Sequence, residues 1–351
     1  MKLASLVVLL VSTSAFAETW DWDNDPRKFD ENYEYTLSAL PLKGDLPLNK
    51  MPWSSSYWPR MKGGINYRWN TPNPTGFNLR SPSRSQIQNM STAQLAELSP
   101  AEKFDLVQGH YDYPLSSLVA WNVTPRAKDF EGVCDGWTAT AIEFTEPAPV
   151  EITNPDGIVI PFGSSDVKAL MSYDVSINYE NGDLGAVFIG DYCHNGRTCR
   201  DINPGAFHVV LANEIGLKKQ SFAVDVDAGK ETWNQPVHGF EFEIVRETSV
   251  RGAYRAFVVH AKFKYAQDDF SGEELVMKIF SWLPTIGTPQ YATETMELDY
   301  VLELDYSGRI IGGSWLGNSK NRHPDIFWKA TNKIKWTKDF EILDKIYKPA
   351  F

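Results

Sequence analysis

Alternating apolar and polar residues characterise the second half of the chain. Phe240, Phe242 and Ile244 are separated by glutamates, and this period of two is typical of a half-buried β-strand. Other apolar segments have the length and composition of strands, and they lie at residues 184–190, 206–212, 221–226, 254–266, 274–282 and 296–305. This half of the chain therefore predicts a sheet.

Helical signals lie closer to the N-terminus. Small and apolar residues recur at helical spacing over 134–144, and a second short helix is expected over 164–173. Two helix starts come earlier, at Ser91 and Ser99, and the second has a proline at the first helical position and a glutamate at the third, as in a capping box. Helices combined with a run of strands predict an α+β fold.

The first 17 residues have the layout of a secretory signal peptide. Lys2 precedes a short apolar run, and Ala15 and Ala17 form a small-residue cleavage pattern. The run is too short to span a bilayer, and no other stretch is long and apolar enough to do so. We therefore expect a soluble protein that is secreted or periplasmic and has no membrane span.

The region before residue 119 contains few periodic segments. It is rich in Pro, Asn, Ser and Trp, which predicts loops and short turns, while its aromatic residues argue against disorder. We therefore divide the chain into the signal peptide at 1–17, an irregular N-terminal region at 18–118 and a main domain at 119–351. The N-terminal region could be a pro-segment that covers a site, because residues 79–85 (LRSPSRS) have the composition of a cleavable loop.

The charge balance excludes one class of partner. The sequence has 45 acidic and 34 basic residues, a formal net charge of −11. An acidic surface repels phosphate backbones, so we expect no nucleic-acid partner.

The three cysteines point to thiol chemistry. Cys193 and Cys199 enclose a polar loop and predict a small disulfide in an oxidising compartment. Cys134 is then left over, which in an exported protein indicates a reactive thiol or an intermolecular partner. A helix is predicted to begin at this residue, and the free N–H groups of a helix start lower a thiol pKa and can bind an oxyanion. We predict that Cys134 is a nucleophile; the alternative is a buried core cysteine.

A thiol nucleophile needs a base and a group that orients the base. His208 lies in the predicted strand 206–212, and Asp225 and Asp227 share one face of the next predicted strand. We expect Cys134, His208 and Asp225 to form a triad. The alternatives are that His208 is a core histidine and that the acids are solvated loop residues.

A resemblance to a known family strengthens this prediction. Residues 231–240 (ETWNQPVHGF) closely resemble the elicitor peptide of oomycete cell-wall transglutaminases, the transglutaminase elicitor family. Flanking segments follow the order of that family, at Ser99–Leu106, Phe162–Leu170, Phe207–Asn213, Phe222–Asp227, Gly312–Trp315 and His323–Asp325. The resemblance covers the chain from about residue 50 to 330.

The resemblance implies a papain-related, transglutaminase-like catalytic domain over 119–351, in which the nucleophile starts a helix packed on an antiparallel sheet. It implies the triad Cys134, His208 and Asp225, an exposed elicitor peptide and a response to calcium, whose ligands it does not identify. A separate structural interpretation of the WNQP residues is that Trp233 packs in the core while Asn234 and Pro236 shape a turn near Asp225.

The implied reaction is acyl transfer from a glutamine carboxamide to a lysine or primary amine through a thioester on Cys134. Its partners would be proteins bearing Gln and Lys; calcium is the only metal implied, and the chemistry itself requires no cofactor. Exclusion of water favours the amine over hydrolysis, and Trp121 and Trp137 are candidates for that role. The alternatives are a papain-like cysteine peptidase, a glutamine deamidase, and a secreted surface or interaction protein without catalytic activity.

Overall fold

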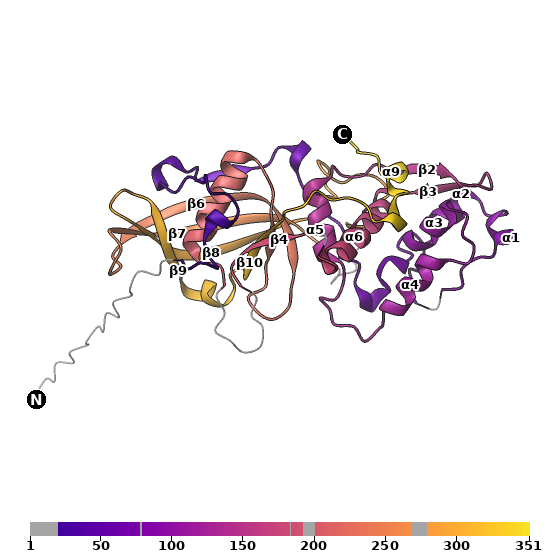
Figure 1. Ribbon diagram of the computed structural model, residues 1–351, viewed down its shortest axis with the longest axis horizontal. Coiled ribbons are helices and arrows are strands. Elements are labelled where there is room, and N and C mark those ends of the chain that lie inside the picture. Colours follow the sequence, from indigo (N-terminus) through magenta and orange to yellow (C-terminus); the bar gives the residue numbers. More distant parts are fainter. Residues whose placement is uncertain (1–19, 78, 183, 192–200, 269–278) are drawn as a thin grey trace, which may run out of the picture.

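The computed structural model describes the chain apart from residues 1–19, 78, 183, 192–200 and 269–278 (Figure 1). The molecule is elongated, with a sheet-rich half and a helix-rich half (Figure 1). Helix α5 (Cys134–Glu143) lies between the two halves.

The main sheet is antiparallel throughout its described strands. Its order is β4-β10-β5-β6-β7-β8-β9, and β1 pairs with β6. The strands are β1 Lys43–Asp45, β4 Ala186–Ile189, β5 Ala223–Asp225, β6 Asn234–Thr248, β7 Arg255–Ala266, β8 Thr293–Leu304, β9 Ile310–Trp315 and β10 Ile326–Ala330. The predicted antiparallel sheet is thus confirmed, and five of the predicted strands fall on β4 to β8. Most of the predicted strand 274–282 lies outside the described residues, and its described part is not a strand.

One predicted strand is wrong, because residues 204–211 form helix α7 (Pro204–Leu211). The Asn203 side chain accepts a hydrogen bond from the Gly205 N–H at 2.8 Å, and Pro204 occupies the first helical position. All eight residues of α7 are buried, so the segment is apolar all round and carries no helical period. A π-helical turn over Ala212–Lys218 continues it.

The helix-rich half contains more regular structure than the sequence predicted. Ser91 and Ser99 cap their helices as predicted, accepting from the backbone N–H three residues later. The elements are α1 Arg84–Ile87, α2 Thr92–Ala96, α3 Pro100–Val107, α4 Pro114–Asn122, α6 Ser164–Glu180, α9 Leu343–Ile346 and the hairpin β2 Val150–Thr153 with β3 Val159–Phe162. Short 3-10 turns lie at Pro26–Lys28, Leu37–Ala39, Leu48–Lys50, Arg60–Lys62, Gly64–Asn66, Gly317–Asn321 and Lys338–Phe340.

The region 18–118 is built into this body. Its helices α2, α3 and α4 share an apolar core with β3 and α6, and β1 joins the main sheet. The boundary at residue 118 stays a prediction.

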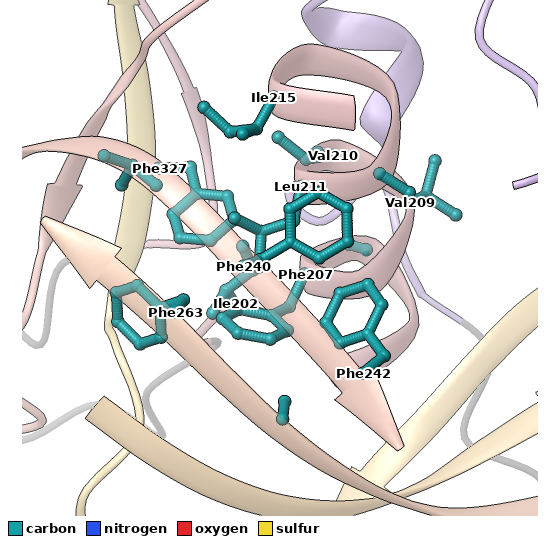
Figure 2. Close-up of a cluster of buried hydrophobic side chains, with 14 of the residues drawn as sticks. Ile202, Phe207, Val209, Val210, Leu211, Ile215, Phe240, Phe242, Phe263 and Phe327 are labelled. Carbon is teal, nitrogen blue, oxygen red and sulfur yellow. The ribbon is translucent and has the colours of Figure 1, made fainter. Parts of the chain in front are cut away.

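The two faces of the sheet carry different helices. Figure 2 shows one of the apolar layers, where Phe207 of α7 packs with Phe240, Phe242 and Phe327. On the other face, Ala139 of α5 belongs to a cluster with Ala223, Ile326 and Trp328. Because side chains alternate along a strand, Ala223 faces α5 while its neighbour in β5 faces α7. Helices α5 and α7 therefore lie on opposite sides of the sheet.

Candidate active site

Cys134 is the first residue of α5 and carries a free thiol. The side chain is buried, with 7% of the residue exposed. Its sulfur lies 3.8 Å from the Thr232 carbonyl oxygen, to which the thiol donates, and 3.7 Å from Nδ2 of Asn234. The predicted position of a thiol at a helix start is confirmed.

Asn234 is the closest polar side chain recorded at the sulfur. Its Oδ1 accepts a hydrogen bond from the Trp328 indole N–H at 2.7 Å. An indole N–H only donates, so Oδ1 must face Trp328 and the amide NH2 must face the sulfur of Cys134. The Thr138 hydroxyl donates to the Asn234 carbonyl at 2.9 Å and ties the start of β6 to α5. The sequence suggested a turn-forming role for Asn234 and missed its contact with the thiol.

Asp225 lies beside this pair but contacts the backbone. It pairs with Asn234 across β5 and β6, on the face of the sheet that α5 covers. Its Oδ1 accepts from the N–H groups of Trp233 at 2.9 Å and Asp227 at 3.2 Å, which closes the turn between the strands. Burial raises the pKa of Asp225 to about 7, and the charge of Asp227 raises it further, against the lowering effect of the two N–H groups. The structural interpretation of the WNQP segment holds in part: a turn lies beside Asp225, but Asn234 and Pro236 belong to β6 and Trp233 is half-buried.

His208 does not contact Cys134 or Asp225 among the recorded hydrogen bonds, so the predicted triad is not assembled in this structure. Its Nδ1 lies 2.7 Å from the Tyr300 hydroxyl, and its ring stacks on Phe242 at 3.9 Å. Phe242 is eight residues along β6 from Asn234, which corresponds to roughly 25 Å at about 3.3 Å per residue. His208 is also on α7, across the sheet from α5, and burial lowers its pKa to about 3. This position agrees with the alternative, a core histidine.

The two tryptophans proposed for solvent exclusion have no recorded contact with the sulfur of Cys134. Trp121 is 88% exposed at the end of α4. Trp137 is fully buried and donates to the Trp53 carbonyl at 3.1 Å, as a core residue.

Another aromatic pair comes from the two segments that adjoin Cys134. Tyr57 and Trp233 meet edge to face with ring centroids 5.4 Å apart. The Tyr57 carbonyl accepts from the N–H of the residue before Cys134 at 2.8 Å, and Trp233 follows the Thr232 carbonyl that faces the sulfur. The pair therefore joins two chain segments that flank the thiol. A cavity of about 460 Å³ lies along the second half of α5, and its lining does not include Cys134.

The electrostatics keep the thiol protonated in this structure. Burial raises the pKa of Cys134 well above its ordinary value, and the carboxylates of Asp135 and Asp268 raise it further. Hydrogen bonds from Asn234 lower the pKa and do not offset burial. The expectation that the helix start lowers the thiol pKa is thus wrong for this covered state, because desolvation outweighs the partial charge of the helix end.

Two expectations concern other parts of the sequence. The elicitor-like segment 231–240 was expected to be exposed, and this is wrong for residues 234–240, which are buried in β6, while Glu231 is exposed and Thr232 and Trp233 are half-buried. The disulfide Cys193–Cys199 lies outside the described residues.

Among the described residues, one group of side chains could hold a metal: Asp201, His323 and Asp325, with ligand atoms all within 4.8 Å of one another. It contains an imidazole nitrogen, whereas calcium takes six to eight oxygen ligands, so the group does not fit the calcium that the resemblance implied. Asp325 precedes β10 and its N–H donates to the Asp225 carbonyl at 3.2 Å, so the group lies at the end of β10 next to β5.

The comparisons with known proteins agree with this architecture. No curated protein matches the chain. Among solved structures, the chain is similar to the GP42 transglutaminase from Phytophthora sojae, with 23% identity, a TM-score of 0.68, and coverage of 94% of this chain and 98% of that chain. At this identity the likeness shows the fold. The sequence model of the transglutaminase elicitor family matches residues 127–339. The chain therefore belongs to the transglutaminase elicitor family.

Proposed function

We propose that the protein is a transglutaminase that uses Cys134 to transfer the acyl group of a protein glutamine to an amine. The observation that carries the proposal is the free thiol on the first residue of α5, with the Asn234 amide aimed at its sulfur. Membership of the transglutaminase elicitor family and the fold shared with a solved transglutaminase support it.

The proposed reaction has two balanced steps. The sulfur of Cys134 attacks the carboxamide carbon, the C–N bond breaks, and ammonia leaves with the proton that the thiol gives up. A lysine or another primary amine then attacks the thioester, which releases the thiol and forms an amide bond. Water in place of the amine would give glutamate.

Asn234 and the start of α5 supply the electrostatic part. The backbone N–H groups of a helix start and the Asn234 amide NH2 are donors on one side of the sulfur. When the carboxamide oxygen gains negative charge, these donors stabilise it. Trp328 holds the amide in this orientation, and the turn closed by Asp225 holds the start of β6.

The covered thiol implies that the site opens before it reacts. We infer that separation of the Tyr57–Trp233 contact opens the path to the sulfur, because Cys134 is buried and the two segments joined by that contact adjoin it. Opening would also rehydrate the thiol and bring its pKa back toward the ordinary value, so access and activation would occur together.

The environment and partners belong to the same proposal. The leader pattern in the sequence supports a secreted or periplasmic enzyme whose substrates are proteins bearing Gln and Lys. Within the described residues, no helix has the length and apolar character needed to cross a membrane.

Incorporation of a fluorescent primary amine into casein tests the function. We expect the wild-type protein to label casein and Cys134→Ser to lose at least about a thousandfold of this rate, because the nucleophile is removed. Ammonia release without amine incorporation would indicate a deamidase, and cleavage of casein would indicate a peptidase. No activity in any of the three assays, with or without calcium, would favour the non-catalytic alternative and overturn the proposal.

A further inference from the structure

Asp201, His323 and Asp325 form a compact group at one end of the main sheet. Asp201 precedes α7, and the other two residues precede β10. His323 and Asp325 are buried and Asp201 is half-buried. The Ile202 N–H donates to the Asp325 carbonyl at 2.8 Å and brings the two segments together.

The imidazole of His323 is oriented as a metal ligand. Its Nδ1 lies 3.0 Å from the Pro324 carbonyl oxygen, which can only accept, so Nδ1 carries the proton. Its ring lies flat on Trp315, with centroids 5.1 Å apart and 6° between the planes, which fixes its direction. The other nitrogen, Nε2, lies 3.6 Å from Oδ2 of Asp201. In a typical metal-binding histidine, one ring nitrogen binds the metal while the N–H of the other nitrogen donates to a carbonyl.

Asp325 supplies an independent sign of a ligand. The residue is 1% exposed, and its Oδ1 has no hydrogen-bond partner among the described residues. Buried carboxylate oxygens are normally hydrogen-bonded or paired with a cation. Asp225 and Asp227 add negative charge near Asp325. Within the described part of the chain, no ion pair is formed by Asp225, Asp227 or Asp325.

We propose that Asp201, His323 and Asp325 bind a divalent transition metal ion of the zinc class. Zinc bonds of about 2.0–2.1 Å in tetrahedral geometry place two ligand atoms about 3.3–3.6 Å apart, which fits the 3.6 Å between the His323 nitrogen and the Asp201 oxygen. One nitrogen and two carboxylates suit zinc or manganese better than calcium. The proposal does not depend on acyl transfer at Cys134.

The metal would join two segments that are far apart in the sequence. It would bind Asp201, in the segment that leads into α7, to His323 and Asp325, which precede β10. The role is therefore structural: binding to the folded protein alone stabilises it against unfolding.

Calorimetric titration of the tag-free, chelator-treated full chain tests the site, with Zn²⁺, Mn²⁺ and Ca²⁺ as the probes. We expect about one Zn²⁺ per chain and a higher Tm with zinc, and no such change with calcium. Asp201→Asn and His323→Gln should each weaken zinc binding at least about tenfold. His260→Gln is the matched control, because His260 and Asp299 form an exposed pair at 2.9 Å and are not part of the group.

Cobalt distinguishes this site from a thiol site. Co²⁺ bound by nitrogen and oxygen gives visible bands without the thiolate charge-transfer band that a cysteine ligand would add. The proposal is overturned if the wild-type chain binds no zinc, if a thiolate band appears, or if binding is equal in Asp201→Asn with a wild-type circular dichroism spectrum. Asp201 is half-buried, so this variant should keep its fold even if His323→Gln does not.

Discussion

A single amide orients the environment of the proposed nucleophile. Asn234 accepts from Trp328 on one side and faces the sulfur of Cys134 with its NH2 group on the other. The thiol therefore has a fixed donor, but it lies in a dry environment beside two carboxylates. At the level of residues, the structure shows a thiol that is positioned and not yet ionised.

This state predicts slow alkylation of Cys134 by iodoacetamide at neutral pH. Only the thiolate reacts, and burial raises the pKa of the thiol, so the thiolate fraction is small at pH 7 and rises about tenfold per pH unit above it. Rates measured between pH 6 and 10 should rise without a plateau near pH 8. Asp268→Asn should increase the rate at pH 8, because it removes a carboxylate that raises this pKa while Gln235 can still donate to the residue. Rapid labelling at pH 6 would contradict the covered state.

His208→Gln separates a core residue from a catalytic one. We expect it to destabilise the fold by about 1–3 kcal/mol, since the contacts with Tyr300 and Phe242 are buried. At a temperature where the variant is folded, kcat for amine incorporation should stay within about twofold of wild type. A loss as large as that of Cys134→Ser, with an intact fold, would show that His208 does act in catalysis.

At the level of elements, the helix caps were readable from the sequence. The Ser99 side chain caps α3 by accepting a hydrogen bond from the Glu102 N–H. The Glu102 carboxylate accepts a hydrogen bond from the Ser99 N–H and forms an ion pair with Arg68. Ser91 makes the same capping box on α2 at an exposed position. These short polar motifs act locally, so their prediction needed no tertiary information.

The two caps predict a graded loss of stability. Ser91→Ala should lower the free energy of unfolding by about 0.5–1 kcal/mol and Ser99→Ala by about 1–2 kcal/mol, because the second leaves buried groups without a partner. Urea unfolding of the two variants measures the difference. Equal losses would mean that the buried network around Glu102 adds nothing beyond the cap itself.

Long-range features explain what the sequence could not predict. Strand β6 was expected from its alternating pattern, β7 and β8 from apolar segments of strand length, and α5 from its helical spacing. Helix α7 was missed because every one of its side chains is buried, which leaves no period to detect. Asn234 was missed as a site residue because its contact with Cys134 joins positions 100 residues apart, and only the pairing of β5 with β6 brings it there.

At the level of the whole molecule, the thiol lies where the two halves meet. Residues 52–59 run through this junction and are buried along their whole length. They are held by Lys168, whose Nζ donates to the Ser54 carbonyl at 2.9 Å, and by Trp137, which donates to the Trp53 carbonyl. The segment that carries Tyr57 is thus packed into the interior of the folded protein.

Limited trypsin digestion tests whether the N-terminal region acts as a pro-segment. Residues 79–85 remain the predicted cleavage site, and Arg84 there is exposed. Cleavage should leave the alkylation rate of Cys134 unchanged. Residues 52–59 precede the cut, and their buried contacts with Trp137 and Lys168, which follow the cut, do not depend on the cleaved bond. A large gain in alkylation and in amine incorporation after clean cleavage would support the pro-segment and contradict this expectation.

The sheet between α5 and α7 separates residues that affect stability from residues that affect the reactivity of the thiol. Changes among the apolar residues on the α7 side can adjust the stability of the protein without altering the contacts of Cys134 on the other side. Changes around Asn234 can alter reactivity while the far layer keeps the fold intact. A protein built in this way can adapt to a harsher medium and to a new substrate by independent routes.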